Sequence, residues 1–165
     1  MAETLARDRL YPSLLDRLID DDPSKSVEVR DNRAFSTARL REAVLRDMNW
    51  LFNSTQNSED LTDYPQIRKS VLNFGLPAVS GRPASSLKLN DLAGALREAL
   101  IFFEPRLIPH TVRVIVDSDK KASHNVITFK LEAQLWAQPI PLEIFMRTDM
   151  DLESGQTRVI ESNDR

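Results

Sequence analysis

The chain has 165 residues, the size of one ordinary domain, with 41 % apolar residues, 28 % charged residues and a net charge of −3. This composition is typical of a globular protein and excludes a chain that is disordered throughout. Cysteine is absent, which excludes a disulfide framework, thiolate metal ligands and a cysteine nucleophile. Acids and bases are interspersed without a long basic stripe, so we do not expect nucleic acid as the main partner.

The N-terminal segment shows no targeting signal. Charged residues such as Arg7, Asp8 and Arg17 interrupt its apolar runs, so a signal-peptide core is missing. No apolar stretch approaches the ~20 residues needed to span a bilayer. We therefore expect a cytoplasmic protein without direct membrane insertion.

Helical spacing of apolar residues dominates up to about Phe103. A first helix is expected to start at Pro12, because proline is favoured at the first helical position, and to end in the aspartates at 20–22. Its apolar stripe consists of Leu14, Leu15, Leu18 and Ile19. A second helix is expected over about 37–52, with Ser36 or Thr37 as its N-cap.

Two further helices are expected in the middle of the chain. Tyr64-Pro65 opens a short third helix with Ile67, Val71 and Leu72 as its apolar residues, and Gly75 closes it in a left-handed conformation. The fourth helix starts from Asn90 as N-cap, and Pro105 stops it. Its apolar residues are so numerous that we expect most of it to be buried.

Alternating apolar and polar residues take over from about Thr111 and predict strands. The alternating segments are 112–116, 126–136, 142–150 and 157–160, separated by a charged turn at 117–125, by Pro139 and Pro141, and by Ser154-Gly155. The sequence therefore predicts an α+β fold, with N-terminal helices packed on one face of a mostly antiparallel meander sheet of three to four strands. We expect a single domain over 1–165, with 1–11 and 162–165 flexible.

The sequence offers few residues for chemistry. His110 and His124 have no carboxylate or second histidine at metal-ligand spacing, so we expect surface histidines and no metal site. Calcium-loop spacing is absent, and the four glycines form no phosphate-binding loop, so no cofactor is expected.

Glu104 is the one carboxylate that invites a catalytic interpretation. It follows a very apolar helix, and burial there would suit it to act as an acid, as in glycoside hydrolases. A second carboxylate would have to come from Asp60, Asp63, Asp117 or Glu132, and nothing places any of them opposite it. The simpler interpretation is a pair with Arg106, two residues away, or with a basic group on a partner. We favour that interpretation and expect no enzymatic activity.

Several segments together resemble the TssE family of type VI secretion baseplate subunits, which is itself similar to the baseplate wedge protein of contractile phage tails. The segments lie at 12–18, 49–53, 64–65, 70–77, 80–81, 101–107, 139–141, 148–151 and 155. The most specific are Leu72-Asn-Phe-Gly-Leu-Pro77 and the Glu-Pro-Arg triplet at 104–106.

The resemblance implies an assembly role. It implies partners TssF and TssG in the baseplate wedge, TssK by way of the wedge, and the sheath subunits TssB and TssC, for which the protein would serve as assembly platform. The family's triplet carries over to Glu104, Pro105 and Arg106 as a partner-binding or structural motif. The alternatives are a peptidoglycan-cleaving, lysozyme-like enzyme and a wedge protein of a phage or phage-tail-like particle.

A meander sheet suits this role, since its edge strands carry unpaired N–H and C=O groups. An arm of a sheath subunit could add to such an edge by main-chain pairing. We expect Pro105 to fix the helix–strand junction, and Glu104 and Arg106 to hold the register of the sheet or of the incoming arm. Replacing Glu104 or Arg106 is then expected to abolish sheath assembly while the subunit stays folded.

Overall fold

Helices precede strands along the chain, as the change in apolar spacing predicts. The computed structural model describes residues 13–19, 24, 36–79, 88–117, 126–137 and 141–162. The helical elements are α1 (Leu14–Leu18), α2 (Thr37–Phe52), α3 (Pro65–Arg68), the 3₁₀ turn η3 (Val71–Asn73), α4 (Leu89–Phe103) and the 3₁₀ turn η5 (Pro109–Thr111). The strands are β1 (Arg113–Val116), β2 (Val126–Leu135), β3 (Leu142–Asp151) and β4 (Thr157–Glu161).

The strands form an antiparallel meander in the order β1-β2-β3-β4, which confirms the predicted α+β class. β2 and β3 make the long central hairpin, paired from Val126↔Asp151 to Leu135↔Leu142. The turn between β3 and β4 contains Gly155 at φ 73°, a left-handed conformation that suits glycine. β1 and β4 are therefore the two edges of this sheet.

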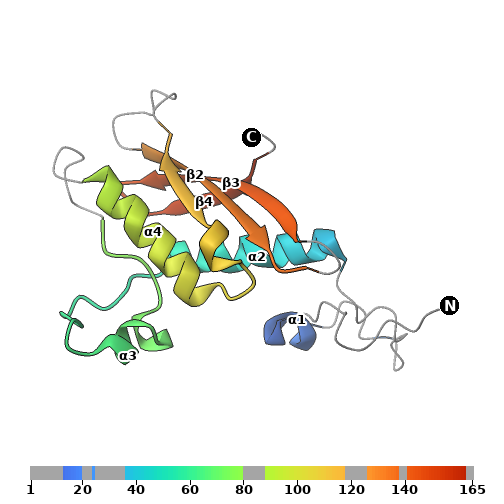
Figure 1. Ribbon diagram of the computed structural model, residues 1–165, viewed down its shortest axis with the longest axis horizontal. Helices are drawn as coiled ribbons and strands as arrows, with labels where there is room; N and C mark the ends of the chain where they lie inside the picture. Colours follow the sequence, from blue (N-terminus) through green and yellow to red (C-terminus); the bar gives the residue numbers. More distant parts are fainter. Residues whose placement is uncertain are drawn as a thin grey trace.

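Helices α2 and α4 cover one face of the sheet, while α1 and α3 stand apart from it (Figure 1). Alternate residues of the central strands point toward these helices, as their period-2 pattern predicts. The fully buried side chains at this interface are Val44, Met48 and Leu51 of α2, Leu96 and Leu100 of α4, Phe129, Leu131 and Leu135 of β2, and Ile144, Met146 and Met150 of β3. One apolar core thus joins both helices to the sheet.

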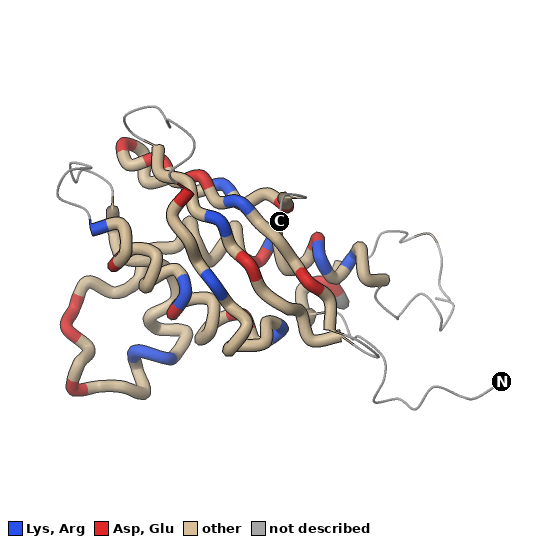
Figure 2. The backbone as a smooth tube through the Cα atoms, turned by 45° about the horizontal axis from the view of Figure 1, so that its top comes forward, with Lys and Arg blue, Asp and Glu red and all other residues tan. Residues whose placement is uncertain are grey.

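The opposite face of the sheet carries the intervening polar residues. Lys130 of β2 lies beside Arg147 of β3, and Thr128 lies beside Asp149. Figure 2 shows Lys and Arg interspersed with Asp and Glu along these strands. Within the described ranges, no helix is long and apolar enough to cross a membrane.

The predicted bounds of α2 are confirmed, whereas those of three other elements differ. Ser36 caps α2 by accepting a hydrogen bond from Arg39 N–H. The prediction of Asn90 as N-cap of α4 was wrong: the helix begins at Leu89, and its N-cap Lys88 makes no side-chain capping bond. Pro105 does end α4, with Glu104 before it in a non-helical conformation (φ −118°, ψ 82°).

The first and third helices are shorter than predicted, and their apolar residues are exposed. α1 begins at Leu14, with Ser13 as its cap; Pro12 and the aspartates at 20–22 lie outside the described residues. The third helix is divided into α3 and η3. Exposed apolar side chains are Leu14, Leu15, Leu18 and Ile19 near α1, and Tyr64, Ile67, Val71 and Leu72 around α3 and η3.

Gly75 has the predicted positive φ, at 129°, but its main constraint is a close backbone contact. The segment after it pairs with the end of α2 through Leu76 N–H to Ser54 O (2.8 Å) and Gln56 N–H to Leu76 O (2.9 Å). A Cβ on Gly75 would lie 2.4 Å from Ser54 O, a distance too short for any side chain at this position. Glycine is therefore required for this loop to lie against α2.

Candidate functional site

The Glu-Pro-Arg corner joins the end of α4 to the sheet. Glu104 N–H still bonds Leu100 O (3.0 Å), and Leu107 N–H then bonds Glu104 O (3.1 Å), so the chain turns tightly around Pro105. Beyond the turn, the corner pairs with the end of β2 through Trp136 N–H to Arg106 O and Ile108 N–H to Gln134 O, both at 2.8 Å. The corner thus fixes where β2 ends, next to the start of β1.

Glu104 and Arg106 bind each other through a two-pronged ion pair. Arg106 Nε donates to Glu104 Oε1 (2.6 Å) and Arg106 Nη2 to Oε2 (2.5 Å), while Glu104 is only 3 % exposed. Such a fork is the favoured geometry for an arginine and a carboxylate. The interpretation that Glu104 pairs with Arg106 is therefore confirmed.

The pair is one end of a longer charge chain. Arg106 Nη2 also donates to Asp47 Oδ2 (2.6 Å), and Arg46 of the same helix bonds both Asp47 (2.9 Å) and Asp16 of α1. Alternating charges in the order Asp16–Arg46–Asp47–Arg106–Glu104 thus connect α1, α2 and the corner. Among the described residues, the ion pair between Asp16 and Arg46 connects α1 to α2.

The charge chain favours the ionised form of three of its members. Burial alone would lower the pKa of Arg106, but its hydrogen bonds and charge attraction to Glu104 and Asp47 outweigh burial, and the pKa is raised. The hydrogen bond from Arg46 lowers the pKa of Asp16, and the same bond raises the pKa of Arg46. The chain is therefore fully charged near neutral pH at these positions.

β1 is the edge strand whose outward main-chain groups have no partner among the residues that the structure describes. Asp117 N–H bonds Thr128 O (2.9 Å). Because main-chain bonding alternates along an antiparallel pair, the N–H and C=O groups of Arg113 and Ile115 also face β2, while those of Val114 and Val116 point away from it. Arg97 of α4 binds the outward carbonyl of Val112 (3.1 Å). Within the described parts of the chain, the outward groups of Val114 and Val116 have no hydrogen-bond partner.

A hollow lies beside this edge. It has a volume of about 500 Å³ and is lined by Val116 together with residues 88–91 at the start of α4. β4, the other edge, is covered by α2, whose Asn49 and Asn53 bind its backbone. As far as the described residues show, the sheet is therefore asymmetric, with an accessible edge at β1 and a covered edge at β4.

The family model described as baseplate wedge protein gp25 matches residues 38–140, which is more than half of the chain. The chain belongs to the gp25 baseplate wedge family. Neither the search of curated proteins nor the search of solved structures returned a match.

The matched range spans α2, α4, the Glu-Pro-Arg corner, β1 and β2, so the charge pair and the accessible edge both lie in the part assigned to the wedge family. A wedge protein is a structural component. Glu104 fits that assignment, because both of its oxygens are engaged by Arg106 and neither is directed at an open site.

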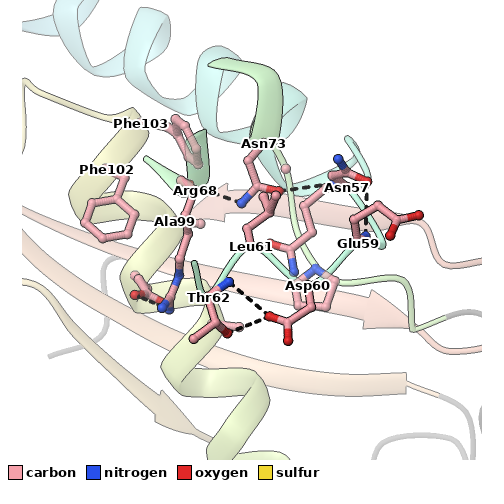
Figure 3. Close-up of a pocket in the computed structure, with 15 residues that line it drawn as sticks. Asn57, Glu59, Asp60, Leu61, Thr62, Arg68, Asn73, Ala99, Phe102 and Phe103 are labelled. Atoms are coloured by element: carbon pink, nitrogen blue, oxygen red, sulfur yellow. Dashed lines mark hydrogen bonds and ion pairs between the residues drawn. The ribbon is translucent and has the colours of Figure 1, made fainter. Parts of the chain in front are cut away.

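The second carboxylates considered for a hydrolase do not meet Glu104. Asp60 lies in a separate polar pocket of about 310 Å³ that Glu104 does not line (Figure 3). Hydrogen bonds from the Thr62 hydroxyl and amide lower the pKa of Asp60, the wrong direction for a general acid. Asp63 is exposed, Asp117 pairs with Lys130 (3.7 Å), and Glu132 lies opposite Arg113 on the polar face of the sheet.

The structure places one of the two histidines. His110 is exposed in η5, and His124 lies outside the described residues. Within the described ranges, no three His, Asp or Glu side chains are grouped so that they could hold a metal ion.

The sequence did not predict the contacts of Asp47, Arg46 and Asp16. No local pattern shows which charged side chains of α1 and α2 lie near one another or near Arg106, which is 59 positions after Asp47. Asn49 and Asn53 were included in a segment of family resemblance, but their contact with β4 was not predicted. Their spacing of four, beside the apolar face of α2, was a usable signal: two short amides on one helix flank that adjoins the core.

Proposed function

We propose that the protein is a structural baseplate subunit of a type VI secretion system, which joins the wedge complex and serves as platform for assembly of the contractile sheath. Its proposed partners are TssF and TssG, TssK by way of the wedge, and the sheath subunits TssB and TssC. Membership of the wedge family supports the structural role. The observation that carries the proposal further is the accessible β1 edge beside the Glu-Pro-Arg corner.

In this proposal, an extended arm of a sheath subunit adds to β1 as a fifth strand. The outward N–H and C=O groups of Val114 and Val116 supply main-chain hydrogen bonds, and the hollow at Val116 receives the arm's side chains. Alternate side chains of the arm lie either over the core, beside α4, or on the polar face of the sheet. Backbone pairing provides affinity, and the side chains provide specificity.

The corner has a positioning role in this proposal. Arg106 forms ion pairs with Glu104 and with Asp47. The Arg106 carbonyl accepts a hydrogen bond from Trp136 N–H at the end of β2. We infer that the triplet fixes the register of the subunit's own sheet, and through it the place of β1. Since Glu104 is buried, alanine at Glu104 or Arg106 is expected to destabilise the fold, contrary to the expectation from sequence that the variants stay folded.

A cleaner test removes one outward donor from β1. In Val114→Pro, the N–H that faces away from β2 is lost while the β1–β2 ladder remains, because proline is tolerated at such edge positions. Val114→Ala is the matched control, since it shortens the same side chain and keeps the N–H. We expect the proline variant to fold and to bind TssF and TssG but to form no sheaths in cells, while the alanine variant forms them. Normal sheath counts with Val114→Pro would refute strand addition at β1.

The family match also accommodates a wedge protein of a phage or phage-tail-like particle. Affinity purification from native cells separates the two, since TssF and TssG accompany the protein in one case and tail proteins in the other. A lysozyme-like activity would instead clear suspensions of purified cell walls, with Glu104→Gln as inactive control. The engagement of Glu104 by Arg106 favours the structural role over this enzyme.

A further inference from the structure

Helix α4 runs along the accessible edge of the sheet. Its first residues line the hollow at Val116, the last residue of β1, and Arg97, about two turns later, binds the carbonyl of Val112, just before β1 begins. The helix and the strand are therefore antiparallel, and α4 borders β1 along the length of the strand. A strand added at β1 would lie beside this flank, and its side chains on the helical side of the sheet would meet α4.

Arg97 limits how much of the edge an added strand can use. Its Nε donates to the Val112 carbonyl at 3.1 Å, which is the outward acceptor at the start of the edge. With this acceptor occupied, the outward groups that remain unpaired among the described residues are the N–H and C=O groups of Val114 and Val116. Arg97 thus marks the point at which main-chain pairing along β1 ends.

The rest of the Arg97 guanidinium has no partner within the part of the chain that the structure describes. Its two Nη atoms make no hydrogen bond or ion pair there, and the residue is exposed. Arg46, Arg68 and Arg106, by contrast, each bind at least one carboxylate. Because the Nε of Arg97 is bound to Val112, the guanidinium is held at the edge, where its Nη atoms can bind a carboxylate end-on through two parallel hydrogen bonds.

The charges along this edge suit an acidic partner. On the side of α4, Lys88 and Arg97 are positive and Asp91 is negative, while on the polar face of the sheet Arg113 lies opposite Glu132 of β2. The described side chains that border the edge therefore carry an excess of positive charge, although the whole chain has a net charge of −3. Complementary charge favours an incoming strand that is acidic.

We propose that β1 selects an acidic strand, in which an aspartate or glutamate binds the Nη atoms of Arg97 and an apolar side chain fills the hollow at Val116. This inference rests on the proposed function, since the strand is the arm of the sheath subunit, and it adds the chemistry by which that arm is recognised. The apolar side chain follows from Leu89 and Val116, which line the hollow. Because Val112 and Val116 are four positions apart, the two side chains of the arm share one face with about the same spacing.

The test titrates the purified full-length chain with two synthetic peptides and follows the amide signals of Val114 and Val116 by NMR. In both peptides valine alternates with threonine. One peptide has a glutamate at each end of the valine row, so that either strand direction brings a carboxylate to Arg97, and the other has glutamine there. Both should shift the two signals, and the glutamate peptide should bind about two- to fivefold more tightly at low salt. High salt should remove this difference, because exposed charges are screened.

Two matched variants assign the preference to Arg97. Arg97→Met keeps an unbranched side chain and removes the charge, so most of the preference for the glutamate peptide should disappear. Arg158→Met removes an exposed arginine of β4 that also lacks an acidic partner among the described residues, and it should retain the preference. In both variants an unchanged signal from Leu131, which is buried in β2, shows that the core is intact.

The possible results separate this inference from the proposed function. Equal binding of the two peptides by the wild type, or an undiminished preference in Arg97→Met, would overturn the acidic arm and leave strand addition at β1 standing. If neither peptide shifts Val114 and Val116, strand addition fails and the inference fails with it. In cells that assemble sheaths, Arg97→Glu should lower the number of sheaths and Arg158→Glu should not, and normal sheath numbers with Arg97→Glu would also overturn the proposal.

Discussion

Removal of Arg106 from the charge chain should cost far more stability than removal of a surface arginine. In Arg106→Met, Glu104 keeps its place in the core, with its side chain 4 % exposed, and loses both hydrogen bonds to the guanidinium. Breaking a buried pair by removing one partner costs about 3–5 kcal/mol, because an uncompensated group is left behind. The Asp47 end of the contact is one-quarter exposed and adds at most about 1 kcal/mol.

Urea and thermal unfolding of the purified subunit measure this effect. For a domain of this size, 1 kcal/mol corresponds to about 2–4 °C in Tm, so Arg106→Met should melt about 6–20 °C lower than wild type. Arg41→Met is the matched control, since Arg41 pairs with Glu161 on the surface and both side chains are more than one-third exposed. Its loss should stay below about 1 kcal/mol.

A double variant decides whether the stranded carboxylate is the cause. Glu104→Leu combined with Arg106→Met removes both members of the pair and should recover most of the stability that Arg106→Met loses, because an apolar pair of similar volume replaces a buried ion pair at little cost. Equal destabilisation of the single and double variants, or a loss below about 1 kcal/mol for Arg106→Met, would refute this reasoning.

Further predictions concern the loop at Gly75 and the anchor of α1. Gly75→Ala should destabilise the fold by about 2 kcal/mol or more in urea unfolding, because its Cβ would overlap Ser54 O and its φ is positive. Gly94→Ala, within α4 and with open space around it, should instead stabilise by about 0.5–1 kcal/mol, and the opposite result at either glycine would contradict this account. Because Arg46 lowers the pKa of Asp16, this carboxylate should stabilise the fold above its ordinary pKa of 3.8 and lose that contribution as the pH falls through the lowered value. Asp16→Asn should therefore reduce stability at neutral pH and leave it unchanged in strong acid, whereas an equal effect at both pH values would argue against an ionic contact.

The strands could be predicted from the sequence because burial alternates along them. Phe129, Leu131, Ala133 and Leu135 occupy one face of β2 in sequence as in structure. The bounds of α2 were equally accessible, since its apolar stripe and the cap at Ser36 coincide. The start of α4 was not, because Asn90 resembles a cap but lies inside a helix whose position is set by packing of Leu92 and Leu96.

In the site, as in the fold, contacts between residues close in sequence could be predicted, and contacts between distant residues could not. The pairing of Glu104 with Arg106 is local, with one rigid proline between them, and the sequence indicated it. Their link to Asp47 depends on how α2 crosses the sheet, which no local pattern contains. The difference between the two sheet edges also depends on tertiary structure. A sequence can indicate which strands are edges, but only the packing of α2 in the described structure shows that β4 is covered and β1 is accessible.

The central claim is that a partner's strand docks on β1. A photo-activatable cross-linking residue at Ile115 on β1, compared with one at Ile160 on β4, tests it most directly in cells that assemble sheaths, since both side chains are exposed on the same polar face of the sheet. We predict an adduct between position 115 and an extended terminal arm of a sheath subunit, and none from position 160. Adducts from position 160, or from neither position in cells with complete sheaths, would contradict the account.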